Sequence, residues 1–186
     1  MSFEFKRLEI PEVVLIKPKL RSDERGFFLE AYKQSDFVKF GITDEFVQEN
    51  HSKSFAKGVI RGLHFQKKPF EQAKLVRVIA GSALDVAVDI RRGSPTFGKW
   101  VSALLSTKNQ SILYIPTGFA HGFCTLEENT EVIYGCSSEY SPQHDRGVIW
   151  SDQNIGIHWP ILKPVLSERD KKWPMLKEAD IGFNYV

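Results

Sequence analysis

Residues 73–90 read AKLVRVIAGSALDVAVDI and contain a strand pattern that indicates the fold class. Two apolar runs, residues 73–80 and 83–90, are separated only by a Gly-Ser pair. In the second run aliphatic residues occupy alternate positions, and Asp85 and Asp89 lie opposite them. A period of two is typical of a strand with one buried face. Two such runs around a short Gly-Ser connection predict a β-hairpin.

The rest of the chain contains similar short apolar runs between turn residues. These turns recur roughly every 8–12 positions, which is typical of a β-sandwich or barrel. We therefore predict an all-β fold, with further strands at residues 13–16, 26–32, 59–65, 100–105, 111–115, 120–125 and 130–137.

Helical signals are few and peripheral. Residues 35–40 predict a short helix, with Ser35 or Asp36 near its N-cap and Gly41 as its C-terminal stop. Residues 167–172 begin with the serine and acidic spacing of a capping box, which predicts one more helical turn.

Composition places the chain among folded proteins and excludes several classes. Its 186 residues fit one domain, residues 1–186, because a domain typically holds ~100–200 residues. The segment from Ser141 is richer in proline and charge, and we expect a wrapping tail there. Hydrophobic residues make up 42% and charged residues 26%, which excludes a disordered chain. No apolar run approaches the ~18 residues of a membrane span, and the net charge of +2 argues against a nucleic-acid coat.

The two cysteines give no metal or redox motif. Cys124 and Cys136 form neither a C-x-x-C pair nor a zinc spacing. The first residues also lack a signal-peptide pattern, so we expect a cytoplasmic protein with both thiols in the core.

Two histidine motifs are the first candidates for chemistry. In RGLHFQ, residues 61–66, strand alternation predicts that His64 and Arg61 face opposite ways. Taken alone, His64 fits a hydrogen-bonded histidine inside a sheet better than a functional residue. In PTGFAHGF, residues 116–123, the Pro-x-Gly-x-x-His spacing resembles that of the cupins, which are small jelly-roll barrels, although His121 also fits a simple turn histidine.

The residues at the first cupin motif argue against a metal. Metal-binding cupins supply His-x-His and a Glu from their first motif, whereas this chain has Gln66 in place of the second His. Lys74 stands where the Glu would fall, and its cation would be repelled by a divalent metal. We therefore expect a barrel pocket without a metal ion.

Three further segments are ambiguous when each is considered alone. Asp170 and Arg169 fit a helix cap and a solvated charge run, respectively. Tyr134 fits a core tyrosine with a satisfied hydroxyl. Arg25 precedes Gly26 and fits either a turn arginine or a fork for phosphate oxygens.

Taken together, the motifs resemble one enzyme family over nearly the whole chain. Five separated segments occur in the order and spacing of the dTDP-4-dehydrorhamnose 3,5-epimerases, namely residues 23–28, 48–50, 61–66, 116–123 and 166–170. The resemblance implies a cupin-like jelly-roll β-barrel and a homodimer whose N-terminal segments cross to the partner. It also implies that neither a metal nor any other cofactor is needed.

The resemblance further implies a reaction. The substrate would be a dTDP-linked 4-keto-6-deoxy sugar of deoxysugar and dTDP-rhamnose biosynthesis, whose ketone makes the C3 and C5 protons acidic. Epimerisation needs a base on one face and an acid on the other. By resemblance, His64 is the base with Asp170 as its partner, Tyr134 is the acid, and Lys74 stabilises the enolate.

Binding residues carry over from the family in the same way. By resemblance, Arg25 and Arg61 contact the diphosphate and sugar, and Tyr140 stacks on the thymine ring. The remaining expected substrate contacts are Phe27, Glu30, Gln48, Asn50, His121 and Arg169.

Three alternatives remain open from the sequence. The nearest is an epimerase that acts at C3 or C5 alone. A metal-dependent cupin is the second, and a cupin that binds a sugar nucleotide without catalysis is the third.

Overall fold

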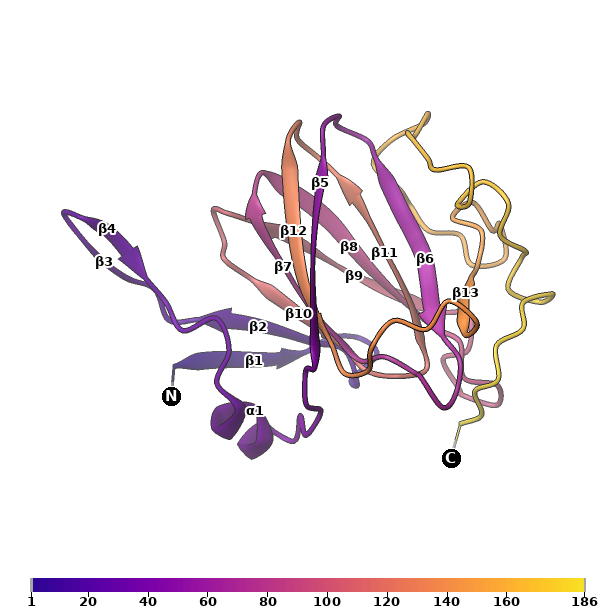
Figure 1. The fold of residues 1–186 in the computed structure, drawn as a ribbon, viewed down its shortest axis with the longest axis horizontal. Helices are drawn as coiled ribbons and strands as arrows, with labels where there is room; N and C mark the ends of the chain where they lie inside the picture. The colour runs from indigo at the N-terminus through magenta and orange to yellow at the C-terminus, as the bar shows by residue number, and fades with distance from the viewer. Residues whose placement is uncertain (1, 186) are drawn as a thin grey trace.

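The computed structural model describes residues 2–185, and most of them form two antiparallel sheets that pack face to face (Figure 1). The six-stranded sheet has the order β1 (Phe3–Arg7), β2 (Val14–Pro18), β10 (Ile112–Ile115), β7 (Lys74–Ala80), β12 (Thr130–Cys136), β5 (Gln48–Ser54). The five-stranded sheet has the order β13 (Asp145–Gly147), β6 (Ile60–Gln66), β11 (Phe119–Thr125), β8 (Ser82–Asp89), β9 (Trp100–Ser106). The predicted all-β fold is confirmed.

The main core lies between the two sheets. Val76 and Val132 of the six-stranded sheet belong to the same buried cluster as Ala87, Val101 and Phe123 of the five-stranded sheet. Burying these side chains from both sheets in one layer supplies the apolar contact that holds a sandwich closed.

Residues 73–90 form a corner between the two sheets and not the predicted hairpin. β7 pairs with β10 and β12, whereas β8 pairs with β11 and β9. Gly81 makes this corner at a φ of 73°, and a Cβ there would lie 2.6 Å from the Thr130 hydroxyl. A short connection between two apolar runs fits either geometry, so the sequence pattern could not separate them.

The prediction that β8 has only one buried face is also wrong, because both of its faces are buried. Asp85 and Asp89 are fully buried, and they share the barrel-facing side of the strand with Ala87. Val86 and Val88 point outward and pack beneath the tail. The alternation is real, but its polar side faces the barrel interior.

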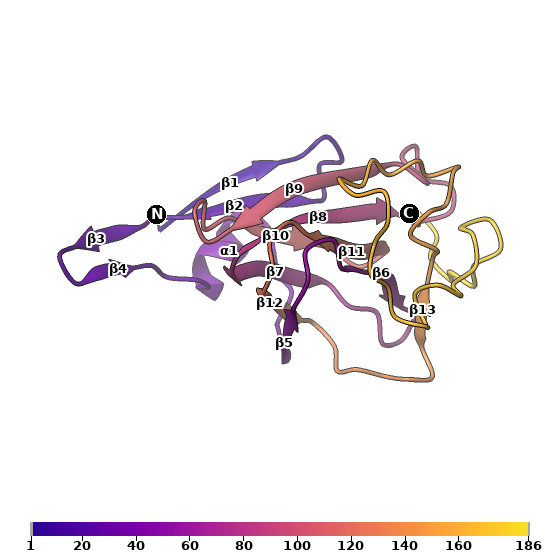
Figure 2. The same cartoon turned by 90° about the horizontal axis from the view of Figure 1, so that it is seen from above.

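The tail wraps the five-stranded sheet, as its composition predicts. Val148, Ile155, Leu176, Ile181 and Phe183 form one buried cluster with the outward-facing residues of that sheet. Figures 1 and 2 show this segment, orange at β13 and yellow toward the C-terminus, beside β6. The tail therefore takes the place of solvent on the outer face.

One helix, α1 (Gln34–Phe40), occurs in the described residues, and it is too short to cross a membrane. Gly41 ends it in the left-handed conformation, as predicted. Its N-cap is Lys33 without a side-chain hydrogen bond, so the prediction of Ser35 or Asp36 is wrong. The second predicted helical region, residues 167–172, is a hydrogen-bonded turn instead.

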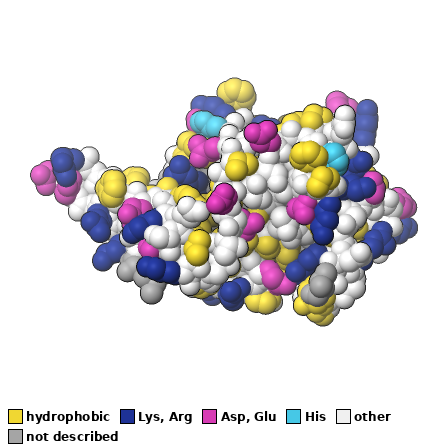
Figure 3. Space-filling view, turned by 60° about the horizontal axis from the view of Figure 1, so that its bottom comes forward, with side chains coloured by type: hydrophobic (Ala, Val, Ile, Leu, Met, Phe, Trp, Pro, Cys, Tyr) yellow, Lys and Arg dark blue, Asp and Glu magenta, His cyan; other side chains and the backbone are white. Residues whose placement is uncertain are grey.

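A hairpin outside both sheets was not predicted. Its strands are β3 (Arg21–Asp23) and β4 (Gly26–Phe28), so the strand expected at residues 26–32 is much shorter. Figures 1 and 2 show the hairpin projecting away from the barrel, and Figure 3 shows charged side chains at its tip. Phe27 and Phe28 on β4 are 60% and 64% exposed. An exposed aromatic pair on a projecting hairpin is typical of a surface that contacts another molecule.

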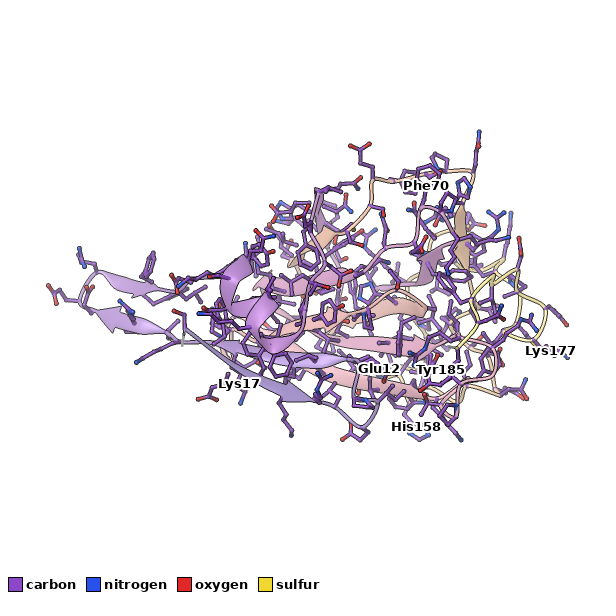
Figure 4. The ribbon with its side chains drawn as sticks, turned by 90° about the horizontal axis from the view of Figure 1, so that it is seen from below. Glu12, Lys17, Phe70, His158, Lys177 and Tyr185 are labelled. Carbon is purple, nitrogen blue, oxygen red and sulfur yellow. The ribbon has the colours of Figure 1, made fainter. Side chains whose placement is uncertain are left out.

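Arg91 links the turn between β1 and β2 and the C-terminal segment to the barrel. Its guanidinium bonds Asp89 and Glu12, and it lies 5.1 Å from the ring centre of Tyr185. Figure 4 labels Glu12 and Tyr185 close together at this end of the molecule. The Arg91 side chain also packs against Gly118, where a Cβ would lie 2.7 Å from its Cγ. These contacts fix the turn that precedes His121.

Candidate active site

Two adjoining cavities of about 360 and 380 Å³ open into the barrel. They share walls made by His64 of β6, Lys74 of β7, Tyr134 of β12 and Arg169 of the tail. Ten of the residues expected from the sequence line one or both cavities: His64, Asp170, Tyr134, Lys74, Gln48, Asn50, Arg61, His121, Tyr140 and Arg169.

A β-bulge places Arg61 on the same side as His64, which corrects the predicted alternation. His64 pairs with His121 and Arg61 pairs with Phe123, so four residues of β6 lie opposite three of β11. Gly62 permits this bulge, since its φ is 123° and a Cβ would lie 2.6 Å from the backbone of β11. The extra residue reverses the side on which Arg61 points.

His64 and Asp170 form a close pair. His64 Nε2 lies 2.5 Å from Asp170 Oδ1, although the residues are 106 positions apart. Burial alone would raise the pKa of Asp170, but hydrogen bonds from His64, Ser167 and Trp173 and the charge of His64 lower it. An ionised carboxylate only accepts hydrogen bonds, so Nε2 carries a hydrogen, and in the neutral imidazole the lone pair then falls on Nδ1. That lone pair is suited to accept a proton.

Lys74 brings a buried amino group into the cavity wall. It is only 7% exposed, and its Nζ donates to the His64 carbonyl oxygen at 3.4 Å. Burial lowers the pKa of Lys74, while the nearby Cys136, Asp145 and Asp85 act in the opposite direction. A cation or N–H donor here can stabilise negative charge that develops on a bound molecule.

Tyr134 faces the cavity from the sheet opposite His64. Burial, helped by Cys136, raises the pKa of Tyr134, so its hydroxyl keeps its proton at neutral pH. Since β12 and β6 belong to different sheets, the tyrosine and the histidine lie on opposite walls. A molecule bound between them would meet a proton acceptor on one side and a proton donor on the other.

His121 is held by Asp85, which the sequence reasoning did not identify as a site residue. The His121 Nε2 lies 3.0 and 3.1 Å from the two Asp85 oxygens, and both side chains are buried. Burial lowers the pKa of His121 and outweighs the attraction of Asp85. The sequence does contain a signal for Asp85, because it alternates with Ala83 and Ala87, whose side chains are small enough for a barrel interior.

Asp145 organises the mouth of the cavity and was also missed. Its Oδ2 accepts from the Tyr140 hydroxyl at 3.2 Å and from Arg169 at 2.5 Å. Gln48 accepts from the Tyr140 backbone N–H at 2.8 Å and donates to Asn50 at 2.9 Å. Two expected binding residues, Tyr140 and Arg169, are thus fixed by one carboxylate.

Arg25, Phe27 and Glu30 lie outside this pocket. Arg25 is on the projecting hairpin, and its side chain is 84% exposed and bonds Asp23. The tip of the hairpin points away from the cavities (Figure 1). Within one chain these three residues do not join the other expected contacts.

No group of three metal-ligating side chains occurs within residues 2–185. His64 and His121 are cross-strand neighbours, but each is paired with a carboxylate. The buried cation of Lys74 lies beside them.

This chain is similar to known epimerases over nearly its whole length. Residues 7–178 match the family model of dTDP-4-dehydrorhamnose 3,5-epimerase. A protein of that name from Shigella flexneri is 50% identical over 175 residues, which cover 94% of this chain and 96% of the relative.

Solved structures show the same cupin-type fold. The dTDP-6-deoxy-D-glucose-3,5-epimerase of Legionella pneumophila, in complex with dTDP-4-keto-L-rhamnose, has a TM-score of 0.95 and 42% identity over 99% of each chain. ChmJ, a 3'-monoepimerase from Streptomyces bikiniensis, has a TM-score of 0.84 and 34% identity, and the match covers 91% of this chain and 86% of ChmJ. The family match and these identities over nearly full length show that this chain belongs to the dTDP-4-dehydrorhamnose 3,5-epimerase family.

Proposed function

We propose that this enzyme inverts C3 and C5 of a dTDP-linked 4-keto-6-deoxy sugar, converting dTDP-4-dehydro-6-deoxyglucose to dTDP-4-dehydrorhamnose in dTDP-rhamnose biosynthesis. The observation that carries the proposal is the placement of His64, paired with Asp170, and Tyr134 on opposite walls of one cavity. Inversion of a carbon requires a base on one face and an acid on the other, and this geometry provides both.

The proposed chemistry uses groups of the chain itself. His64 Nδ1 accepts the proton from the carbon next to the ketone, and the electron pair moves onto the ketone oxygen as an enolate. Lys74 stabilises that oxygen from the cavity wall. Tyr134 donates its proton to the opposite face of the carbon, which restores the ketone and leaves a tyrosinate. Exchange with solvent then returns both groups to their starting protonation states.

The remaining cavity residues supply binding in this proposal. Arg61 and Arg169 are cations suited to the diphosphate, because guanidinium donors match phosphate oxygens. Tyr140, 51% exposed at the mouth, offers an aromatic face to the thymine. His121, Gln48 and Asn50 complete the polar lining.

We also propose a homodimer in which the hairpin of one chain completes the pocket of its partner. Exposed Phe27 and Phe28 on a projecting hairpin support this arrangement, as does the position of Arg25 outside its own pocket. The complex in the Legionella structure supports the class of ligand. Both cysteines are buried free thiols, which suits the cytoplasmic location expected from the sequence.

The direct test is NMR of the dTDP-4-keto-6-deoxyglucose substrate in heavy water. We expect enzyme-dependent loss of both the C3 and the C5 proton signals, because each abstracted proton is replaced from solvent. Loss at a single position would indicate a monoepimerase, the activity named for ChmJ. No exchange above the enzyme-free control would reject catalysis and leave a binding protein. Metal analysis of protein purified without chelators tests the metal-dependent alternative, which requires about one bound ion per chain.

Mixed dimers test the exchange of hairpins between subunits. Arg25→Ala and His64→Asn are each expected to be inactive as pure proteins. Co-refolding equal amounts makes heterodimers with one intact site, since the His64 of one chain meets the Arg25 of the other. We expect about a quarter of wild-type activity from random pairing. If each hairpin served its own barrel, the mixture would stay inactive.

A further inference from the structure

Trp173 lies behind the His64–Asp170 pair, and the proposed reaction assigns it no role. Its indole Nε1 donates to Asp170 Oδ1 at 3.3 Å, and the same oxygen lies 2.5 Å from His64 Nε2. The indole also meets the imidazole edge-on, with ring centres 6.1 Å apart and an interplanar angle of 68°. One side chain therefore contacts both members of the pair.

The Trp173 indole packs directly against a glycine of the five-stranded sheet. Gly147 of β13 is the cross-strand neighbour of His64. A Cβ at Gly147 would lie 2.5 Å from Trp173 Cδ2 and Cε2, so any larger residue would displace the ring. The Arg169 guanidinium lies over the indole at 5.6 Å from its centre. Trp173 is thus confined between the sheet and a charged side chain.

The other oxygen of Asp170 is fixed independently. Ser167 Oγ donates to Asp170 Oδ2 at 2.9 Å and accepts the Asp170 backbone N–H at 3.0 Å. Ser167 donates to one oxygen and the Trp173 indole to the other, so these two hydrogen bonds fix the plane of the carboxylate without any contribution from His64. Donors at both oxygens restrict rotation of the carboxylate about its terminal bond.

We propose that Trp173 is a positioning residue that fixes the Asp170 carboxylate and, through it, the direction of His64 Nδ1. The inference rests on the proposed function, in which that nitrogen accepts the substrate proton. Proton transfer depends strongly on the position of the base, so a small rotation of the imidazole lowers the rate without removing any binding contact.

The variant Trp173→Phe tests this role, because it keeps an aromatic ring and removes the N–H donor. We expect kcat to fall about tenfold while KM stays within about twofold. Losing a donor leaves more negative charge on Asp170 Oδ1, which favours the protonated imidazole. The acid-side midpoint of the kcat/KM profile should therefore move to higher pH. The variant keeps the other charged and titratable groups that surround this pair in the wild-type protein: Arg61, Lys74, Asp85, His121, Tyr134, Asp145 and Arg169.

Trp159→Phe is the matched control. In the wild-type chain the Trp159 indole Nε1 donates to the Trp150 carbonyl oxygen at 2.8 Å, so the control variant also loses one indole hydrogen bond in the tail. It should leave kcat and the pH profile at wild-type values. The proposal is overturned if Trp173→Phe matches this control, or if its loss of activity occurs without a shift of the profile.

A second measurement needs no substrate and separates this inference from the proposed function. The chain has four tryptophans, so the indole N–H signal absent from Trp173→Phe identifies Trp173 in a ¹H–¹⁵N spectrum. In the otherwise wild-type chain, Asp170→Asn should shift that signal and leave the Trp159 signal in place. An unmoved Trp173 signal would refute the contact even in an active enzyme. Absence of exchange by the wild-type enzyme would instead refute the proposed function.

Discussion

The variant His64→Asn is expected to lose epimerase activity by about 10²–10⁴-fold, the usual contribution of a positioned general base. His64 is the group paired with Asp170 at 2.5 Å, and asparagine keeps an amide near that carboxylate but cannot accept a proton. Because the step it removes is proton abstraction, solvent exchange at C3 and C5 should fall together with product formation. Both are measured by NMR in heavy water.

His158→Asn is the control for this variant. His158 packs edge-on against Trp100, with ring centres 5.9 Å apart, and is labelled at the lower edge of Figure 4. It lines neither cavity. Wild-type exchange in the control and near-background exchange in His64→Asn would support the assignment. Full exchange in His64→Asn would remove His64 from the mechanism.

The variant Lys74→Met is expected to lower kcat by about 10²–10³-fold, as when one donor to an oxyanion is lost. Methionine keeps much of the length of the side chain and removes the ammonium of the one lysine that lines both cavities among residues 2–185. The defect should appear in kcat/KM as well, because the enolate exists only after the substrate has bound. Steady-state kinetics with the dTDP sugar measure both quantities.

The same variant should make the fold more stable at neutral pH. Burial lowers the pKa of Lys74, so its charge costs free energy in the folded state below that lowered pKa. The cost is relieved as pH rises from the lowered pKa toward the ordinary value of 10.5. Lys74→Met should therefore raise the free energy of unfolding by on the order of 1 kcal/mol at pH 7, with a smaller gain at higher pH.

Urea denaturation at several pH values measures this change, with Lys177→Met as the control. The Lys177 side chain is 66% exposed and near Glu178, so its loss should change stability little. A Lys74→Met protein that is both fully active and no more stable than wild type would contradict the role given to this buried charge.

The resemblance of the motifs to one family indicated which residues line the pocket, but not how their side chains are oriented. His64, Lys74, Tyr134 and Asp170 meet in the structure because each motif lies on a strand or turn that reaches the same cavity. The side on which Arg61 points could not be predicted, because the one-residue bulge at Gly62 reverses strand alternation.

The sequence also could not predict which face of each strand meets the barrel interior. A strand with alternating polar and apolar residues has one face of each kind, but the pattern does not say which face meets solvent. Asp85 was therefore placed on the outside, although it faces His121 within the barrel. Similarly, the pair of runs around Gly81 is compatible with a hairpin within one sheet and with a corner between two. Contacts with distant parts of the chain, such as the tail over Val86, decide both cases.

The tail that covers the five-stranded sheet also carries Asp170, and this has a consequence for synthesis of the protein. A ribosome finishes His64 and the other barrel strands before it makes residues 167–173, because Asp170 follows His64 by 106 positions. A nascent chain with a complete pair of sheets still lacks the carboxylate that bonds His64. The His64–Asp170 pair therefore forms only after residues 167–173 emerge and dock, and a product that is terminated before them would not have this pair.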